Sequence, residues 1–264
     1  MANLSPQRKQ ALDDGTAEAR NLAECLAVDQ AALVRAVLPS LGLGEELAPV
    51  LAALQAVSDK GISRQIAAVG EAVGAALDGR WRTDRTAVLA AMAGHSSDTV
   101  RSWAAFAVAR SDRHGVLQNR LEAMSPFAAD RHFGVREWAW LAVRPHVAAA
   151  PLAAIEILCG WTGSPDPNIR RFAVESTRPR GVWCEHIALL KSDPAVAEPL
   201  LAPLKADPAR YVQDSVANWL NDASKTRADW VTEICRRWSA DDHPATERIV
   251  GRAMRTLRKQ QAAT

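Results

Sequence analysis

Apolar residues recur every three to four positions through nearly the whole chain, which is the period of an α-helix, and strand-rich stretches are absent. The pattern predicts an all-α fold. Helices are expected over residues 16–38, 45–57 and 62–77, and the third is rich in Ala and Gly and therefore suited to close packing. Residues 1–14 are polar and are expected to form a frayed lead-in.

The middle of the chain repeats itself. Three segments align without gaps, with first residues 35 and 34 positions apart: VRSWAAFAVAR (100–110), VREWAWLAVRP (135–145) and IRRFAVESTRP (169–179). Looser copies begin at Val212 and at His243. A period of this length in a helical sequence indicates stacked helix pairs, so we predict a single HEAT-like α-solenoid over residues 1–264 whose inner helices line a concave groove.

Short polar pairs, most of them containing proline, mark the expected helix starts. These pairs are Ser97-Asp98, Asp166-Pro167, Asp193-Pro194, Asp207-Pro208 and His243-Pro244. Arg-Pro closes the second and third copies, where Pro145 and Pro179 are expected to end the helices. We expect the helices over 135–144, 169–177 and 211–222 to lie side by side along the concave surface.

A helix over residues 207–225, DPARYVQDSVANWLNDASK, has two contrasting faces. One is an apolar arc made of Val212, Val216, Trp219 and Leu220. The other carries a phenol, two carboxylates and two amides, from Tyr211, Asp214, Asn218, Asn221 and Asp222. These polar groups are short, so the face is better suited to a bound ligand than to bulk water.

Glu175 departs from the repeat, because the earlier copies have Phe106 and Leu141 at its position. Arg171 and Arg178 flank it at i−4 and i+3. One interpretation is an ordinary helix-surface salt bridge, which contributes little to stability. The other is a carboxylate set between guanidinium groups and aimed into the groove.

A second departure is Glu137, which stands where the first copy has Ser102. Trp140 and Arg144 follow at i+3 and i+7, so a helix places them with Glu137 on its solvent side. A tryptophan outside the core indicates either a ligand contact or packing against the next helix pair. Asp222 has a simpler alternative as a helix-terminal turn residue.

Charge is unevenly distributed although the formal net charge is only +2. Residues 80–145 carry 10 basic and 6 acidic residues, and every basic residue there is arginine. The planar guanidinium favours phosphate contacts, which indicates nucleic acid. The alternative is the preference of a GC-rich genome for arginine over lysine.

The four cysteines, Cys25, Cys159, Cys184 and Cys235, form no CxxC pair and have no histidine at ligand spacing. They are expected to be reduced core residues, without a metal. The N-terminus has no apolar signal-peptide core, and no apolar run reaches the length of a membrane span. A soluble cytoplasmic protein is expected.

Three segments, taken in order, resemble the AlkC-type DNA alkylation repair glycosylases, of the HEAT-like superfamily that includes the AlkD type. They are RRFAVESTRPRGVW (170–183), DPARYVQDSVANWLNDASK (207–225) and AMRTLRK (253–259). The chain departs from the family pattern at Ser176, Gly181-Val182, Trp219 and Arg252, positions that bear on lesion specificity. The sequence ends without the immunoglobulin-like extension of longer members, so it is similar to the shorter ones.

The resemblance implies a monomeric glycosylase that needs no cofactor and removes cationic N3- or N7-alkylated purines from duplex DNA. Carboxylates would stabilise an oxocarbenium-like sugar and hold the attacking water, beside an aromatic wall. The implied catalytic residues are Glu175, Asp222, Trp183 and, by a looser match, Glu137. The implied DNA contacts are Arg136, Trp140, Arg144, Arg171, Arg178, Arg180, Tyr211, Asn218, Lys225, Arg252 and Arg255.

Two alternatives stay open. One is a HEAT-type scaffold that binds protein or DNA without catalysis. The other is a DNA-binding member that has lost excision. Trp183 has its own alternative as a packing anchor. The separation of Glu175 and Asp222 distinguishes these functions, because a gap too long for one water and one sugar favours binding over chemistry.

Overall fold

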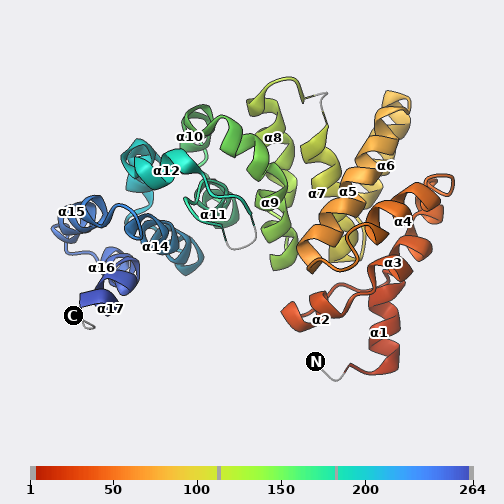
Figure 1. Ribbon diagram of the computed structural model, residues 1–264, viewed down its shortest axis with the longest axis horizontal. Coiled ribbons are helices and arrows are strands. Elements are labelled where there is room, and N and C mark those ends of the chain that lie inside the picture. The colour runs from red at the N-terminus through yellow and green to blue at the C-terminus, as the bar shows by residue number, and fades with distance from the viewer. Residues whose placement is uncertain (1–3, 112–113, 182–183, 262–264) are drawn as a thin grey trace. The chain divides into compact units, whose positions relative to one another are not determined.

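The computed structural model describes residues 4–111, 114–181 and 184–261. Within these ranges it contains 17 α-helices, a few short 3-10 helices and no strand, which confirms the all-α prediction (Figure 1). The chain forms two compact units, Met1–Val143 and Arg144–Thr264, and each is described by itself. The prediction of one continuous repeat domain stays a prediction.

The first unit contains eight helices and most of a ninth, which crosses into the second unit. They are α1 (Pro6–Asp13), α2 (Leu22–Ala27), α3 (Gln30–Val37), α4 (Leu47–Gln55), α5 (Ile62–Asp78), α6 (Arg82–Ala93), α7 (Asp98–Arg110), α8 (Leu117–Ala128) and α9 (Phe133–Ala149). The second unit continues with α10 (Pro151–Cys159), α11 (Pro167–Ser176), α12 (Ala188–Ser192), α13 (Glu198–Leu201), α14 (Arg210–Ser224), α15 (Ala228–Ser239), α16 (Pro244–Ala253) and α17 (Arg255–Gln261).

The helix pair with the most extensive packing in the first unit is α5 with α7, and glycine permits it. A Cβ atom added at Gly70 would lie 2.5 Å from Cβ of Phe106 and 2.6 Å from the carbonyl oxygen of Trp103. Both distances are well inside van der Waals contact, so only a residue without a side chain fits. The expected close packing of the helix over 62–77 is confirmed.

In the second unit α14 is the central helix, with α11, α15 and α16 packed against it (Figure 1). The predicted apolar arc is fully buried: Val212, Val216, Trp219 and Leu220 are each 0% exposed. The expected neighbours over 169–177 and 211–222 therefore lie side by side. Most of the helix over 135–144 belongs to the other unit, so its alignment with them, and the concave surface, stay predictions.

A polar clasp recurs at the second position of the first four repeat copies. Arg101, Arg136, Arg170 and Gln213 each donate a side-chain hydrogen bond to the carbonyl oxygen six residues earlier, at distances of 2.7 to 2.8 Å. Two of the arginines also form a bidentate ion pair with an aspartate that lies five residues before the following copy. Arg101 pairs with Asp130 and Arg170 with Asp207. The clasp supports the assignment of Val212 as the start of a fourth copy.

Several predicted helix starts are confirmed. Side chains of Ser97, Asp166 and His243 accept backbone N–H bonds at the first turns of α7, α11 and α16. Asp193-Pro194 instead opens a 3-10 helix, Pro194–Ala197. Asp207-Pro208 also does not open α14 directly, since the helix begins at Arg210. The Asp207 carboxylate instead accepts hydrogen bonds from Ala209 N–H and from Arg170.

Three expectations were wrong. The lead-in over 1–14 contains a helix, α1, capped by Ser5 and anchored by the buried Leu12. The helix over 16–38 is two shorter helices, α2 and α3, because Asp29 accepts hydrogen bonds from the first N–H groups of α3 and starts a new helix there. Pro145 lies inside α9, which continues to Ala149, whereas α11 ends before Pro179 as expected.

Candidate functional site

The two predicted carboxylates of the second unit come together. Glu175 lies in the last turn of α11 and Asp222 in the last turn of α14, and these helices pack against each other. Both residues are buried, with 3% and 4% of their surface exposed. The structure thus brings together two groups that are 47 residues apart in the sequence.

One guanidinium spans the gap between them. Arg178 Nη1 lies 3.1 Å from Glu175 Oε2, and Arg178 Nε and Nη2 lie 2.9 and 2.6 Å from Asp222 Oδ2. Burial lowers the pKa of Arg178, but attraction to the two carboxylates and hydrogen bonds to both raise it above its usual value. The salt bridge considered for Glu175 therefore exists, but it is buried and shared by two carboxylates rather than lying on a helix surface.

Further groups fix Glu175. The hydroxyl of Ser215, on α14, donates to its Oε1 at 2.6 Å, and Arg171 Nη2 lies 3.6 Å from the same oxygen. The Arg171 guanidinium also lies over the ring of Tyr211, 4.3 Å from its centroid, in cation–π geometry. Ser215 is a site residue that the sequence reasoning missed. It could have been found, because it precedes Asp222 by seven residues and so shares its helix face.

Arg144 binds the backbone of the segment that contains Arg178. Its guanidinium donates to the carbonyl oxygens of Ser176 at 3.0 Å, Arg178 at 2.5 Å and Glu185 at 3.1 Å. Burial lowers the pKa of Arg144, which is 2% exposed, and neutral carbonyls are its partners. The indole N–H of Trp219 donates to the carbonyl of Thr177 at 3.1 Å. The turn after α11 is thus tied down from two sides.

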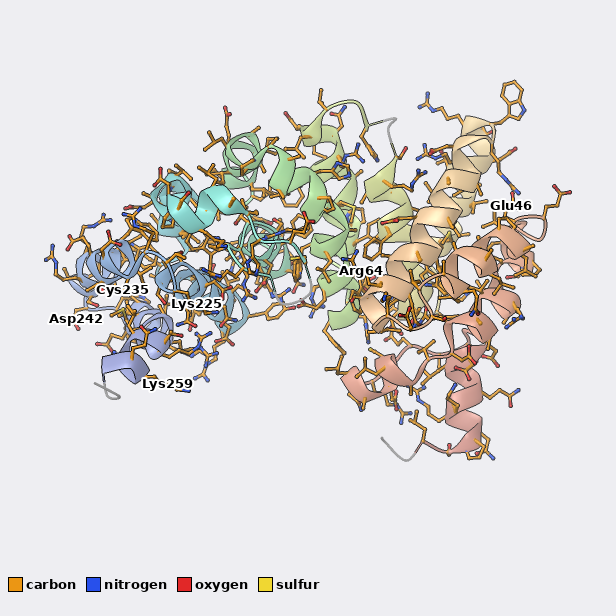
Figure 2. The ribbon with its side chains drawn as sticks, in the orientation of Figure 1. Glu46, Arg64, Lys225, Cys235, Asp242 and Lys259 are labelled. Carbon is orange, nitrogen blue, oxygen red and sulfur yellow. The ribbon has the colours of Figure 1, made fainter. Side chains whose placement is uncertain are left out.

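The remaining predicted contacts lie in the C-terminal half of α14 or directly after it. Lys225, labelled in Figure 2, pairs with Asp222 Oδ1 at 3.1 Å. Asn218 accepts a 3.0 Å hydrogen bond from Arg255. Asn221, by contrast, was placed on an open polar face but is 3% exposed, because its amide donates to Ala253 O and to the Thr256 hydroxyl.

The remaining predicted DNA-contact and catalytic residues of the second unit are Arg252, Arg180 and Trp183. Arg252 Nε lies 3.1 Å from Asp214 Oδ1. Arg180 has a buried Nε without an acceptor among the residues that the structure describes. Trp183 lies outside those residues. That these residues take part in binding or catalysis stays a prediction.

In the first unit, the expected exposure of Trp140 was wrong. Trp140 is 4% exposed, and its indole N–H donates to Glu137 Oε2 at 2.8 Å. The same expectation fails for Arg144, the first residue of the second unit, whose contacts with backbone carbonyls bury it. Arg136 donates to the carbonyls of Asp130 and Arg131 as part of the recurring clasp.

Solved structures share the fold of this chain. No protein-family model matches the chain. Among solved structures, it is similar to Pseudomonas fluorescens alkylpurine DNA glycosylase AlkC bound to DNA containing an abasic site analog, with a TM-score of 0.69 and 24% identity. That match covers 88% of this chain and 63% of AlkC. The chain has the AlkC/AlkD-type HEAT-like fold.

A second solved structure has a similar fold, and one further protein is similar in sequence. AlkD2 from Streptococcus mutans matches with a TM-score of 0.60 and 19% identity, over 79% of this chain and 97% of that one. The uncharacterized protein YhaZ of Bacillus subtilis (strain 168) is 40% identical over 119 residues, which are 45% of this chain and 33% of YhaZ. The matched part of this chain thus spans a third of YhaZ, and the chain spans less than two thirds of AlkC. Separately, no helix in the described part of the chain combines the length and apolar character of a bilayer span.

Proposed function

We propose that this protein is a DNA glycosylase that hydrolyses the N-glycosidic bond of cationic N3- or N7-alkylated purines in duplex DNA. The observation that carries the proposal is the pair Glu175 and Asp222, held on either side of one planar cation, the Arg178 guanidinium. The AlkC/AlkD-type fold supports it, because AlkC is an alkylpurine DNA glycosylase seen bound to DNA.

Hydrolysis of this N-glycosidic bond needs little general acid catalysis. An alkylated purine with a positive charge leaves as a neutral base when the C1′–N bond breaks, and it takes the bonding electron pair. Positive charge then develops on the sugar, where two fixed carboxylates stabilise it better than water does. One of them also accepts the proton of the water that attacks C1′.

In this proposal the sugar cation would replace the Arg178 guanidinium between the two carboxylates. When DNA binds, the guanidinium would turn toward a phosphate and leave the carboxylates to the sugar. Arg144 and Trp219 would keep the turn after α11 in place during this exchange, since their bonds go to its backbone rather than to the Arg178 side chain. Duplex DNA is the proposed partner, and neither metal nor cofactor is needed for this step.

A second function is a DNA-binding protein without excision activity. The burial of both carboxylates favours it, because a closed ion-pair network can be purely structural. The two functions differ in what the carboxylates do when DNA is bound, so the test must separate excision from binding.

The test is single-turnover release of 3-methyladenine or 7-methylguanine from alkylated duplex DNA by Glu175→Gln and Asp222→Asn. Each variant is expected to lose on the order of a hundredfold or more in rate, as when a preorganised electrostatic contact is removed. Duplex binding should be unchanged or tighter, since a negative charge near phosphates is removed. Glu233→Gln, an exposed carboxylate on α15, is the matched control and should cut at the wild-type rate.

Circular dichroism and thermal melting would show that each variant is folded. Excision at the wild-type rate by both folded variants would refute the catalytic assignment. A wild-type protein that binds the duplex and releases no base from any N3- or N7-alkylated substrate would establish the binding function instead.

A further inference from the structure

A cluster of three metal-ligating side chains lies in the first unit. Cys25 comes from α2, Asp98 is the first residue of α7, and His132 directly precedes α9. Their ligand atoms, Sγ, a carboxylate oxygen and an imidazole nitrogen, all lie within 4.8 Å of one another. All three residues are buried, with 6%, 2% and 6% of their surface exposed.

The backbone of Ala19 orients two of these ligands. His132 Nε2 lies 2.7 Å from the carbonyl oxygen of Ala19, so this nitrogen carries the proton and donates it. Asp98 Oδ1 accepts the N–H of Ala19 at 2.8 Å. Nδ1 of the histidine and Oδ2 of the aspartate face each other at 3.5 Å. Histidine ligands in metal sites are oriented in the same manner, through a carbonyl or carboxylate on the other ring nitrogen.

This arrangement sets two acceptors against each other. With the proton on Nε2, Nδ1 presents a lone pair 3.5 Å from Asp98 Oδ2, away from water. The Cys25 thiol donates to the same oxygen at 3.8 Å, and Gly134 N–H donates to Nδ1 at 3.1 Å. A cation between the two acceptors would replace both of these donors. Gly134 keeps the flank open, because a Cβ there would come within 3.1 Å of the imidazole.

We propose that Cys25, Asp98 and His132 bind one zinc ion. Thiolate, imidazole and carboxylate together suit Zn²⁺, with bonds of about 2.3, 2.0 and 2.1 Å. Tetrahedral bonds of those lengths place the ligand atoms about 3.3 to 3.6 Å apart, close to the observed 3.5 and 3.8 Å. Zn²⁺ displaces the Cys25 proton to solvent, and the two anionic ligands balance its charge. Water takes the fourth position.

The alternative is that His132 only caps a helix. Its Nδ1 accepts the N–H of Gly134 at 3.1 Å, as His243 Nδ1 accepts the N–H of Ala245 at 3.2 Å. His243, however, is exposed and is not part of a described cluster of metal ligands. Zinc would take the Nδ1 lone pair from Gly134 and tie together segments that are 73 and 34 residues apart in the sequence.

The test uses untagged full-length protein, stripped with chelator, reloaded with zinc alone, dialysed and measured by inductively coupled plasma mass spectrometry. Wild type is expected to retain one zinc per chain. Cys25→Ser and His132→Gln should bind zinc more weakly by a factor above the about 10- to 100-fold that loss of an outer-shell partner costs. Cys235→Ser, at the buried cysteine labelled in Figure 2, is the control and should match wild type.

A second measurement needs no variant. Cobalt added to the stripped wild-type protein should give a thiolate-to-cobalt charge-transfer band, which appears only if a cysteine sulfur is a ligand. Wild-type protein with neither retained zinc nor this band would overturn the proposal. Zinc retained equally by folded Cys25→Ser and His132→Gln would also overturn it, since the ion would then lie elsewhere.

Discussion

Arg170 and Asp207 offer the sharpest test of the clasp that joins successive repeats. The pair is bidentate, at 2.6 and 2.9 Å, with side-chain exposures of 12% and 3%. Arg170→Met keeps an unbranched apolar stem but leaves the Asp207 carboxylate buried without its cation. Removing one partner of a buried pair costs about 3 to 5 kcal/mol. At about 2 to 4 °C per kcal/mol for a domain of this size, the melting temperature should fall by at least about 6 °C.

Asp207→Asn should cost less, about 1.5 to 3 kcal/mol, because Arg170 keeps the carbonyl oxygens of Ser164 and Pro165 as acceptors. The double variant should lose less than the sum of the two, since no charge is then left unpaired. Arg236→Met breaks an ion pair whose side chains are 72% and 52% exposed, and as the control it should leave stability close to that of wild type. Urea unfolding measures all four variants. Additive losses, or an Arg170→Met cost no larger than the control, would refute the reasoning.

Three further predictions concern packing, acid stability and DNA. Gly70→Ala should destabilise by about 1 to 3 kcal/mol in urea unfolding because its Cβ would overlap Phe106, whereas Gly79→Ala, with no neighbour nearer than 3.8 Å, should not. Burial lowers the pKa of His95 from its usual 6.5, so the unfolded chain binds the proton more readily. The contribution of His95 to stability should be fully present above pH 6.5 and should be lost as the pH drops through the folded pKa. His95→Asn, which keeps a side-chain acceptor, should therefore lose less stability than wild type between pH 7 and 5. An unchanged dependence of stability on pH would contradict this. If the protein binds duplex DNA as proposed, Arg255→Gln should reduce the salt dependence of binding by about one power of salt concentration in titrations at several salt levels, and an unaltered dependence would exclude a phosphate contact.

Local chemistry predicted much of the fold. Ser97 and Asp166 cap helices as expected, because an oxygen at that position satisfies N–H groups that a helix leaves open. The helix α1 was missed because its sequence is polar and only Leu12 is buried, although Ser5-Pro6 is a valid start signal. Pro145 shows the opposite failure, since α9 continues through a residue that removes one of its hydrogen bonds.

The sequence predicted the positions of site residues that lie on the repeated helices. It did not predict the position of a residue that lies in a turn. Glu175 and Asp222 are on helices of successive copies, so their meeting follows from the period. Arg178 lies beyond the end of α11, where helical spacing no longer applies, and its reach to both carboxylates depends on the turn. Arg144 was expected on the surface because no sequence pattern reveals that three backbone carbonyls need a donor.

The clasp also bears on how such a chain can change length during evolution. Asp130 and Asp207 each lie five residues before the first residue of the next copy, Val135 and Val212, although they are 29 and 37 residues beyond the arginines they bind. The position of the aspartate is therefore fixed relative to the start of the next copy, and it does not depend on the length of the connection between the copies. Insertions between copies are absorbed in that connection, and duplication of a whole copy would carry both halves of the contact with it.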